Sequence, residues 1–417
     1  MSHSRRQFLK SPLISGISLS LVASFRRTVA EDSLSGDAFR LSRDVPTKYF
    51  DGEHCWCHAR AGIVPGGGQG NMPRVVMTMN TMDLDGSDVF KGIYDLHTDD
   101  LSKSWTEPRE LTSMAPRHET IDGVERPVAA SDFWPKWHKA SKTLLGTGHS
   151  VVYTPEWKIV AKRPRHTIYA EYDPKAGQWN GWKKLAMPAE PKFNNAGAGC
   201  TQRLDEPDGT ILLPIYFKPP DSNTRVAVMR CEFDGNRLEY VNHGSELGID
   251  DTTRGVGEPS IATFGGKYFL TVRHDKRAYI TSGDDGIHFA QLQPWTFDDG
   301  SELGSYNTQA HWVTHSDALY LVYTRRGLNN DHVFRHRAPL VMAQVDPERL
   351  CVLRDTEVHL VPERGARLGN FGVTDVSPEE TWVTVTEWMQ PKGCEKYGSD
   401  GSVHVARIHW NRPNGLF

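Results

Sequence analysis

Short apolar runs, rich in β-branched and aromatic residues, recur along most of the chain. Clear examples span residues 74–79, 210–216, 267–273 and 318–323. Each run is bounded by Gly, Asp, Asn or Pro, which is typical of strands that end in tight turns. After residue 40 no segment keeps a long amphipathic helical period with end caps. The pattern therefore predicts an all-β protein.

Dipeptides that favour hairpin turns separate many of these runs. They stand at residues 208–209, 234–235, 265–266, 285–286 and 400–401. Asp-Gly and Gly-Gly pairs favour such turns because they accept a positive φ. No linker rich in Pro, Gly or Ser divides the chain. We therefore expect a single domain over residues 31–417.

The first thirty residues follow a different pattern, that of an export signal. Residues 4–10 read Ser-Arg-Arg-Gln-Phe-Leu-Lys, a twin-arginine motif. The apolar stretch behind it, residues 12–24, is too short and too polar to span a bilayer. Small residues at 28–30 then offer a cleavage point. We predict that residues 1–30 direct the folded chain to the periplasm or the extracellular space, unless an uncleaved signal tethers it to the membrane.

Composition limits the classes of partner and cofactor. The 417 residues are 24% charged and 38% hydrophobic, with a formal net charge of −4 at pH 7. This balance offers no basic face for nucleic acid, and no later segment has the length of a transmembrane helix. The six cysteines include no Cys-x-x-Cys spacing. Cys55, Cys57, His54 and His58 form a local group that a metal could use, but we interpret the two thiols as small buried hydrophobes. We predict neither a metal nor a cofactor.

Two segments share the turn motif Ser/Thr-x-Asp-x-Gly-x-x-aromatic. Residues 282–289 match it at every defined place, and residues 98–105 match it with Ser102 in the place of Gly. In such a turn the carboxylate and the hydroxyl bond the hairpin backbone, while Gly takes a positive φ. Residues 172–179 form a weaker version. The motif resembles the Asp-box repeat of the sialidase superfamily, in which it reports the propeller fold rather than the chemistry.

The distance between the two motifs indicates the number of repeats. Their first residues, 98 and 282, lie 184 positions apart. Three propeller blades of about 61 residues would fill that distance and give about six blades in all, whereas four of about 46 would give eight. The sialidase superfamily uses six. We therefore predict a six-bladed β-propeller of four-stranded antiparallel blades.

The resemblance also implies a site at the mouth of the central channel, where the inner strands converge. Sialidase-like enzymes use an arginine cluster for the substrate carboxylate, an Asp as acid/base, and a Tyr nucleophile with a Glu partner. Residues 58–65 and the strand behind them resemble the family's opening segment, which makes Arg60 a predicted carboxylate ligand. The loop at residues 83–88 occupies the place of the acid/base, for which we choose Asp88 ahead of Asp85.

A second match surrounds Glu258. A Glu-Pro pair, a strand, Arg273 and the motif at residues 282–289 follow in the order of the sialidase blade that supplies a base and an arginine. Glu258 would activate a tyrosine, since a phenol of pKa about 10 is a poor nucleophile without a nearby base. Tyr306 is the predicted nucleophile. It follows the second motif too soon for the family pattern, and the alternative, Tyr397, comes late.

A segment rich in histidine and arginine, residues 311–337, supplies further candidates. Arg325 and Arg337 could provide the arginine that the sialidase pattern still lacks. His311 in this segment, and His149 at the start of an earlier strand, could act as acid or base near neutral pH. Such groups would suit a polysaccharide lyase, in which Arg or His neutralises a uronate and His or Tyr removes a proton.

We therefore expect an exported, sialidase-like glycoside hydrolase that acts on an acidic terminal sugar of a glycan by a retaining mechanism. The alternatives are a lyase or another propeller glycosidase that uses His149 or His311, and a glycan-binding propeller without activity. The twelve tryptophans would suit sugar stacking, although a role in plugging the core explains most of them.

Overall fold

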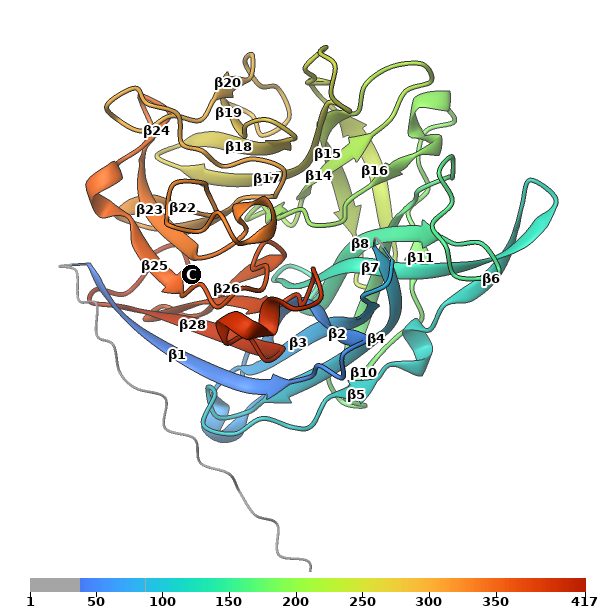
Figure 1. Cartoon of the computed structure of the whole chain (residues 1–417), viewed down its shortest axis with the longest axis horizontal. Helices are drawn as coiled ribbons and strands as arrows, with labels where there is room; N and C mark the ends of the chain where they lie inside the picture. The colour runs from blue at the N-terminus through green and yellow to red at the C-terminus, as the bar shows by residue number, and fades with distance from the viewer. Residues whose placement is uncertain (1–37, 87) are drawn as a thin grey trace, which may run out of the picture. The chain divides into compact units, whose positions relative to one another are not determined.

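The computed structural model of the chain describes residues 38–86 and 88–417, all within the compact unit that spans residues 31–417. The predicted export signal, residues 1–30, lies outside the described residues. Six antiparallel sheets are arranged around a central axis (Figure 1). The prediction of an all-β, six-bladed β-propeller is thereby confirmed. Within the described ranges, no helix has the length and apolarity that crossing a membrane requires.

Each blade is one sheet, and the blades follow one another in sequence order. The first blade comprises β2 (His54–Val64), β3 (Arg74–Asp83), β4 (Val89–Thr98) and β5 (Arg109–Glu110). The second comprises β6 (Arg117–Ile121), β7 (Val124–His138), β8 (Thr143–Val152), β9 (Thr167–Asp173), β10 (Gln178–Trp179) and β11 (Lys183–Lys184). The third comprises β12 (Ala196–Gly197), β13 (Leu204–Asp205), β14 (Ile211–Phe217), β15 (Arg225–Phe233) and β16 (Leu238–His243).

The second half of the ring has the same plan. The fourth blade comprises β17 (Val256–Phe264), β18 (Lys267–His274), β19 (Tyr279–Gly283) and β20 (Gln293–Pro294). The fifth comprises β21 (His311–His315), β22 (Ala318–Tyr323), β23 (Leu340–Asp346), β24 (Cys351–Val352) and β25 (Val358–Val361). The sixth comprises β26 (Phe371–Ser377), β27 (Glu380–Thr386), β28 (Ser402–Trp410) and β1 (Phe39–Lys48).

Helical structure in the described residues is confined to short turns of 3-10 helix. These are η1 (Gln69–Asn71), η2 (Thr112–Met114), η3 (Pro191–Asn194), η4 (Phe334–His336), η5 (Arg354–Thr356) and η6 (Cys394–Tyr397). They lie in connections between strands, so the framework around the channel consists of strands alone.

The ring is closed by strands from opposite ends of the described chain. β1 pairs antiparallel with β28, from Phe39 opposite Trp410 to Lys48 opposite Ser402. In Figure 1 the blue first strand lies beside the red last strand. The first strand is therefore the outer strand of the sixth blade, and it covers an edge of β28 that would otherwise offer unpaired backbone groups.

The two turn motifs lie three blades apart, one after β4 and one after β19. In the turn of residues 282–289, the carboxylate that bonds the backbone belongs to Asp285, one place after the motif's Asp284; its Oδ1 accepts hydrogen bonds of 3.0 and 2.7 Å from the amides two and three residues on. Gly286 there has a φ of +79°, and Ser102 in the turn of residues 98–105 has a φ of +72°. The sequence spacing predicted six blades because the two turns sit at equivalent places in the first and fourth blades.

Aromatic side chains fill most of the interior. Nine of the twelve tryptophans are buried, namely Trp56, Trp134, Trp179, Trp182, Trp295, Trp312, Trp382, Trp388 and Trp410. All six cysteines are buried and free of disulfides. Most of the tryptophans therefore pack the blades together instead of lying on the surface as platforms for sugars.

Candidate functional site

Four successive blades each bring to one cavity a side chain whose residue has a positive φ. His58, Asp132 and Glu258 lie where the pairing slips, between β2 and β3, β7 and β8, and β17 and β18. Cys200 follows β12. All four residues have a positive φ, between 44° and 58°, which costs a non-glycine residue free energy. A bulge of this kind re-aims a side chain, and here each one points into the same cavity.

The cavity has a volume of about 620 Å³ and a lining dominated by charged groups. Its arginines are Arg163, Arg165, Arg254, Arg273, Arg335, Arg337 and Arg367. Its carboxylates are Asp88, Asp132, Glu258 and Asp275. Seven guanidinium groups thus face four carboxylates, and the remaining titratable lining is His58, His149, His274, Tyr216 and Cys200. The excess of positive charge suits the cavity to an anionic ligand.

Two of these arginines are paired with carboxylates of the cavity. Arg273 donates through Nη1 to Glu258 Oε1, and its Nη2 lies 2.5 Å from Asn307 Oδ1. Arg254 Nη2 lies 2.8 Å from Asp275 Oδ1. These pairs hold two guanidinium planes in place at the cavity wall, with their positive charge largely balanced.

Arg337 differs from these two arginines because it is not paired with any carboxylate in the described part of the chain. It is 3% exposed, its Nη2 donates to the carbonyl of Asn307, and its Nε has no hydrogen-bond partner. No ion pair with a carboxylate of the described residues involves it. Burial, followed by the positive charge of Arg273, lowers the pKa of Arg337 to about 9. Burial likewise lowers the pKa of Arg367 to about 10. A buried cation held in this way is stabilised when an anion binds beside it.

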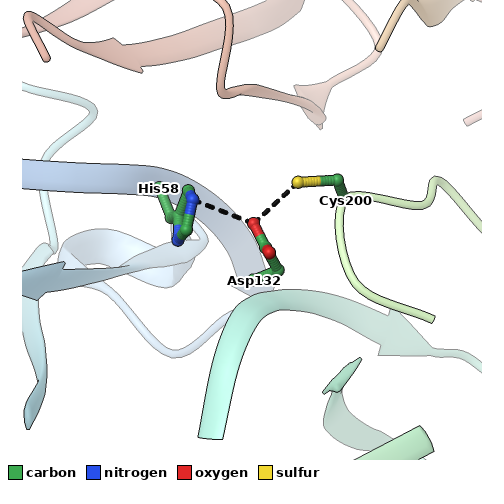
Figure 2. A group of neighbouring side chains, drawn as sticks. All are labelled: His58, Asp132 and Cys200. Atoms are coloured by element: carbon green, nitrogen blue, oxygen red, sulfur yellow. Dashed lines mark hydrogen bonds and ion pairs between the residues drawn. The ribbon is translucent and has the colours of Figure 1, made fainter. Parts of the chain in front are cut away.

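Asp132 lies at the centre of a second group, of which Figure 2 draws Asp132 with His58 and Cys200. Its Oδ1 is 2.9 Å from His58 Nε2, 2.6 Å from Cys200 Sγ and 3.4 Å from Arg60 Nη1. Its Oδ2 is 3.4 Å from His149 Nε2. Burial opposes ionisation of this carboxyl, but His58, His149 and Arg60 together hold its pKa well below the usual range. The aspartate is therefore a buried carboxylate.

Tyr216 extends this group along the wall of the cavity. Tyr216 Oη lies 2.8 Å from His149 Nδ1, and the guanidinium of Arg165 lies 4.6 Å from the centre of the Tyr216 ring. Burial raises the pKa of Tyr216. Burial lowers the pKa of His149 to about 3, against the effect of Asp132. The result is a chain of hydrogen-bonding groups from the tyrosine through a neutral imidazole to the buried aspartate.

The structure brings five of the nine predicted site residues together in the cavity lining. These are Asp88, His149, Glu258, Arg273 and Arg337. Arg60 is completely buried behind the lining, where it donates to Asp132 and Cys200. Its predicted role as a direct carboxylate ligand stays a prediction, and its observed contacts are with the groups that support the cavity.

The other three predicted residues are not among the residues that line the cavity. Tyr306 Oη lies 2.6 Å from His336 Nδ1. Arg325 Nη2 lies 2.7 Å from Glu357 Oε1. His311 is completely buried. Tyrosine is present in the lining only as Tyr216, which the sequence did not single out.

The two alternatives considered from the sequence also lie elsewhere. Asp85 Oδ1 is 2.5 Å from Lys392 Nζ. Tyr397 is 45% exposed, and its ring centre lies 4.4 Å from that of His332. Neither is among the residues of the cavity lining.

Several groups of the cavity carry no motif in the sequence. Arg163, Arg165 and Arg367 come from connections between strands, where a lone arginine has no distinguishing pattern. Asp132 could have been identified from the sequence, because it is the one carboxylate in the otherwise apolar or small run of residues 128–134. A charged residue within a buried strand is rare unless it is paired, so it indicates a site.

Comparison with known proteins supports the fold. No family model and no curated protein sequence matches the chain. A protein of unknown function from Dyadobacter fermentans is 13% identical over 89% of this chain and 99% of its own, with a TM-score of 0.56. The sialidase of Trypanosoma rangeli, solved with the inhibitor DANA, is 12% identical over 85% of this chain and 55% of its own, with a TM-score of 0.54. The NanB sialidase of Streptococcus pneumoniae is 11% identical over 87% of this chain and 70% of its own, with a TM-score of 0.57. The chain thus spans between about half and seven-tenths of the length of these sialidases, and it shares the fold of sialidase propellers.

Proposed function

We propose that the protein is a glycan-processing enzyme that binds an acidic sugar by its carboxylate in the arginine-lined cavity. The observation that carries the proposal is Arg337, a buried guanidinium without a carboxylate partner, beside Arg273 in a cavity with seven arginines and four carboxylates. A planar guanidinium donates two parallel hydrogen bonds to a carboxylate, so an anionic sugar would supply the missing acceptor. The sialidase of Trypanosoma rangeli, which has the same fold, has been solved with sialic acid.

In the leading form of the proposal the reaction is glycoside hydrolysis. Arg273 and Arg337 would orient the sugar carboxylate, and Asp88 at the cavity wall would protonate the leaving oxygen. Glu258, held by Arg273, would act as the base for a nucleophile. Tyr306 as the nucleophile would have to leave His336 and enter the cavity, whereas Tyr216 is already there. Comparison of Tyr306→Phe with Tyr216→Phe therefore distinguishes the two tyrosines.

A specific observation favours β-elimination as the second candidate. Tyr216 hydrogen-bonds to His149 at the cavity, His149 Nε2 lies 3.4 Å from Asp132 Oδ2, and the Arg165 guanidinium lies over the tyrosine ring. In a lyase, the Tyr216 hydroxyl would pass its proton to His149 and take up the proton beside the carboxylate of a uronate, while arginine stabilises the charge that develops there. The product would be an unsaturated uronate, which absorbs in the near ultraviolet.

The experiment is to supply a sialoside and a uronate polymer to the purified chain. Release of reducing sugar without new ultraviolet absorbance supports the hydrolase, and absorbance from the uronate polymer supports the lyase. Arg337→Met should weaken binding of the acidic sugar by about 100-fold, because the lost charge-assisted pair is worth about 2–5 kcal/mol. The matched control is Arg237→Met at a side chain that is 68% exposed, which should leave binding unchanged. Equal binding of neutral and acidic sugars, or an unaltered Arg337→Met variant, would contradict the proposal.

A further inference from the structure

We propose that His58, Asp132 and Cys200 bind a divalent transition-metal ion such as Zn²⁺ at the inner wall of the cavity. The three residues come from the first, second and third blades, and their potential ligand atoms all lie within 4.8 Å of one another. They are 2%, 6% and 4% exposed. Figure 2 shows His58 and Cys200 pointing toward Asp132 from either side. The inference does not rest on the proposed hydrolase, although Asp132 also belongs to the group of side chains invoked for β-elimination.

The chemistry of the three donors favours zinc over the harder alkaline-earth ions. A thiolate, an imidazole and a carboxylate together form a set typical of Zn²⁺ and neighbouring transition metals, whereas Mg²⁺ and Ca²⁺ prefer oxygen alone. The distances are close to those required. Bonds of about 2.0–2.3 Å to a tetrahedral zinc place the ligand atoms about 3.3–3.7 Å apart. His58 Nε2 and Cys200 Sγ lie 2.9 and 2.6 Å from Asp132 Oδ1, so shifts of about 1 Å would admit the ion.

The backbone holds these side chains at a cost in free energy. His58, Asp132 and Cys200 have φ values of +58°, +52° and +56°, a region that non-glycine residues rarely adopt. Three such residues from different blades converge on one point. Packing alone does not require this arrangement, because apolar side chains on regular strands can also fill a propeller channel. Strain that is repeated at one point is typical of a functional site, and a metal is the ligand that uses all three donors at once.

Neighbouring groups are placed to support the ligands. Arg60 Nη2 lies 3.0 Å from Cys200 Sγ and its Nη1 lies 3.4 Å from Asp132 Oδ1, as expected of a donor that stabilises a thiolate and a carboxylate behind a metal. His149 Nε2 lies 3.4 Å from Asp132 Oδ2, which leaves Oδ1 for the ion. His58 Nδ1 is buried without a hydrogen-bond partner and can carry the ring proton when Nε2 binds the metal.

Binding of the metal ion releases one proton from the site. The ion forms bonds to His58 Nε2, Asp132 Oδ1 and Cys200 Sγ, and the proton of the Cys200 thiol leaves to solvent through the cavity. One thiolate and one carboxylate neutralise the ion, and Arg60 then leaves one net positive charge. Three protein ligands leave a fourth position, which faces the cavity and suits an oxygen ligand from water or from an anion.

The test is a titration of the chain, purified without a histidine tag and freed of metal, with Co²⁺ and then Zn²⁺. We expect one Co²⁺ per chain with a sulfur-to-cobalt charge-transfer absorption, and displacement of cobalt by zinc. Cys200→Ala should remove the absorption. Cys57→Ala is the matched control, because this buried thiol is adjacent to His58 in sequence but contacts the Asn80 carbonyl instead, and it should leave the absorption intact. Arg60→Lys should weaken cobalt binding by about 10–100-fold while the absorption remains.

A second measurement keeps the proposal testable if a variant fails to fold. In the unaltered chain, Zn²⁺ should slow alkylation of Cys200, followed by mass spectrometry of its peptide, and should leave alkylation of Cys231 unchanged. No charge-transfer absorption in the folded chain, an absorption that persists in Cys200→Ala, or equal alkylation rates with and without Zn²⁺ would each overturn the metal site.

Discussion

Arg337 combines burial, positive charge and the lack of a carboxylate partner in one side chain. Even a buried ion pair can often be replaced by apolar side chains of similar volume with no loss, or with a gain of about 1–4 kcal/mol, and a buried charge without a partner is more costly still. The Arg337 cation therefore costs stability, and binding of an anion offsets that cost. A residue that is unfavourable for folding and favourable for binding is what a ligand site is expected to contain.

This residue also sets a pH dependence for anion binding. Arg337 has a pKa lowered to about 9 by burial and by Arg273, with Glu258 acting in the opposite direction and Arg335 and Arg367 adding to the repulsion. A bound carboxylate raises that pKa, so binding takes up a proton. Affinity for sialic acid or glucuronate should be constant from neutral pH to about pH 8 and fall above about pH 9, by up to about tenfold per pH unit.

Calorimetric titrations at a series of pH values measure this profile. Arg337→Met should bind weakly at every pH and show a flat profile, since the group that titrates is absent. An unaltered chain whose affinity stays constant to pH 10 would show that Arg337 does not contact the anion.

At the scale of elements, the turn after β19 shows how a short motif stabilises a blade. Asp285 Oδ1 accepts two backbone hydrogen bonds, and Oδ2 lies 2.6 Å from His288 Nδ1. Burial opposes the shift, but these hydrogen bonds lower the pKa of Asp285 to about 2. Because the folded pKa is below the ordinary value of about 4, the stabilisation is fully present above pH 4 and is lost as the pH falls toward 2.

Asp285→Ala should therefore lower the free energy of unfolding by about 1 kcal/mol at pH 7, the usual cost of removing a side chain that accepts hydrogen bonds from free backbone amides. The difference between the variant and the unaltered chain should shrink at pH 3. Urea unfolding at both pH values measures it. Asp284→Ala, at the motif's own aspartate, is the control and should change stability little, because that carboxylate makes no hydrogen bond to the described residues. A difference that grew as the pH fell would reject this account of the turn.

The elements also explain which parts of the site the sequence could predict. Glu258 and Arg273 belong to one hairpin, so a local order of residues was enough to place both in the cavity. Asp132 and Cys200 belong to different blades, where a bulge aims Asp132 and a turn after β12 aims Cys200, and neither arrangement leaves a sequence motif. The sequence predicted no metal because it has no Cys-x-x-Cys spacing and because the thiols of its one local group, residues 54–58, were interpreted as buried hydrophobes.

At the scale of the whole molecule, the sequence again predicted what depends on local order, the repeat of the blades, and missed what depends on distant residues, the closure of the ring. The spacing of two turns predicted six blades because each turn recurs once per blade at an equivalent place. The pairing of β1 with β28 could not be predicted in this way, because it joins residues more than 350 positions apart, as in Phe39 opposite Trp410. Only the closed ring shows that the first described strand completes the last blade.

This closure predicts where a single substitution should affect the stability of the whole ring. Phe39 is 7% exposed, and its ring centre lies 5.6 Å from that of Trp410 and 6.0 Å from that of Tyr320 in the fifth blade. Phe39→Ala should lower the free energy of unfolding by about 3–5 kcal/mol, because it removes a buried aromatic at the junction of two blades. Val45→Ala in the same strand, at a side chain that is 36% exposed, should cost less than about 0.5 kcal/mol.

Urea unfolding followed by tryptophan fluorescence and by circular dichroism measures both variants. The two probes should give coincident transitions, because a closed ring cannot lose its sixth blade without exposing the core of its neighbours. Affinity of the folded Phe39→Ala variant for the acidic sugar should be unchanged, since this residue does not line the cavity. A loss in Phe39→Ala no greater than that in Val45→Ala would mean that β1 contributes little to closure. In that case β26, β27 and β28 would complete the ring without β1.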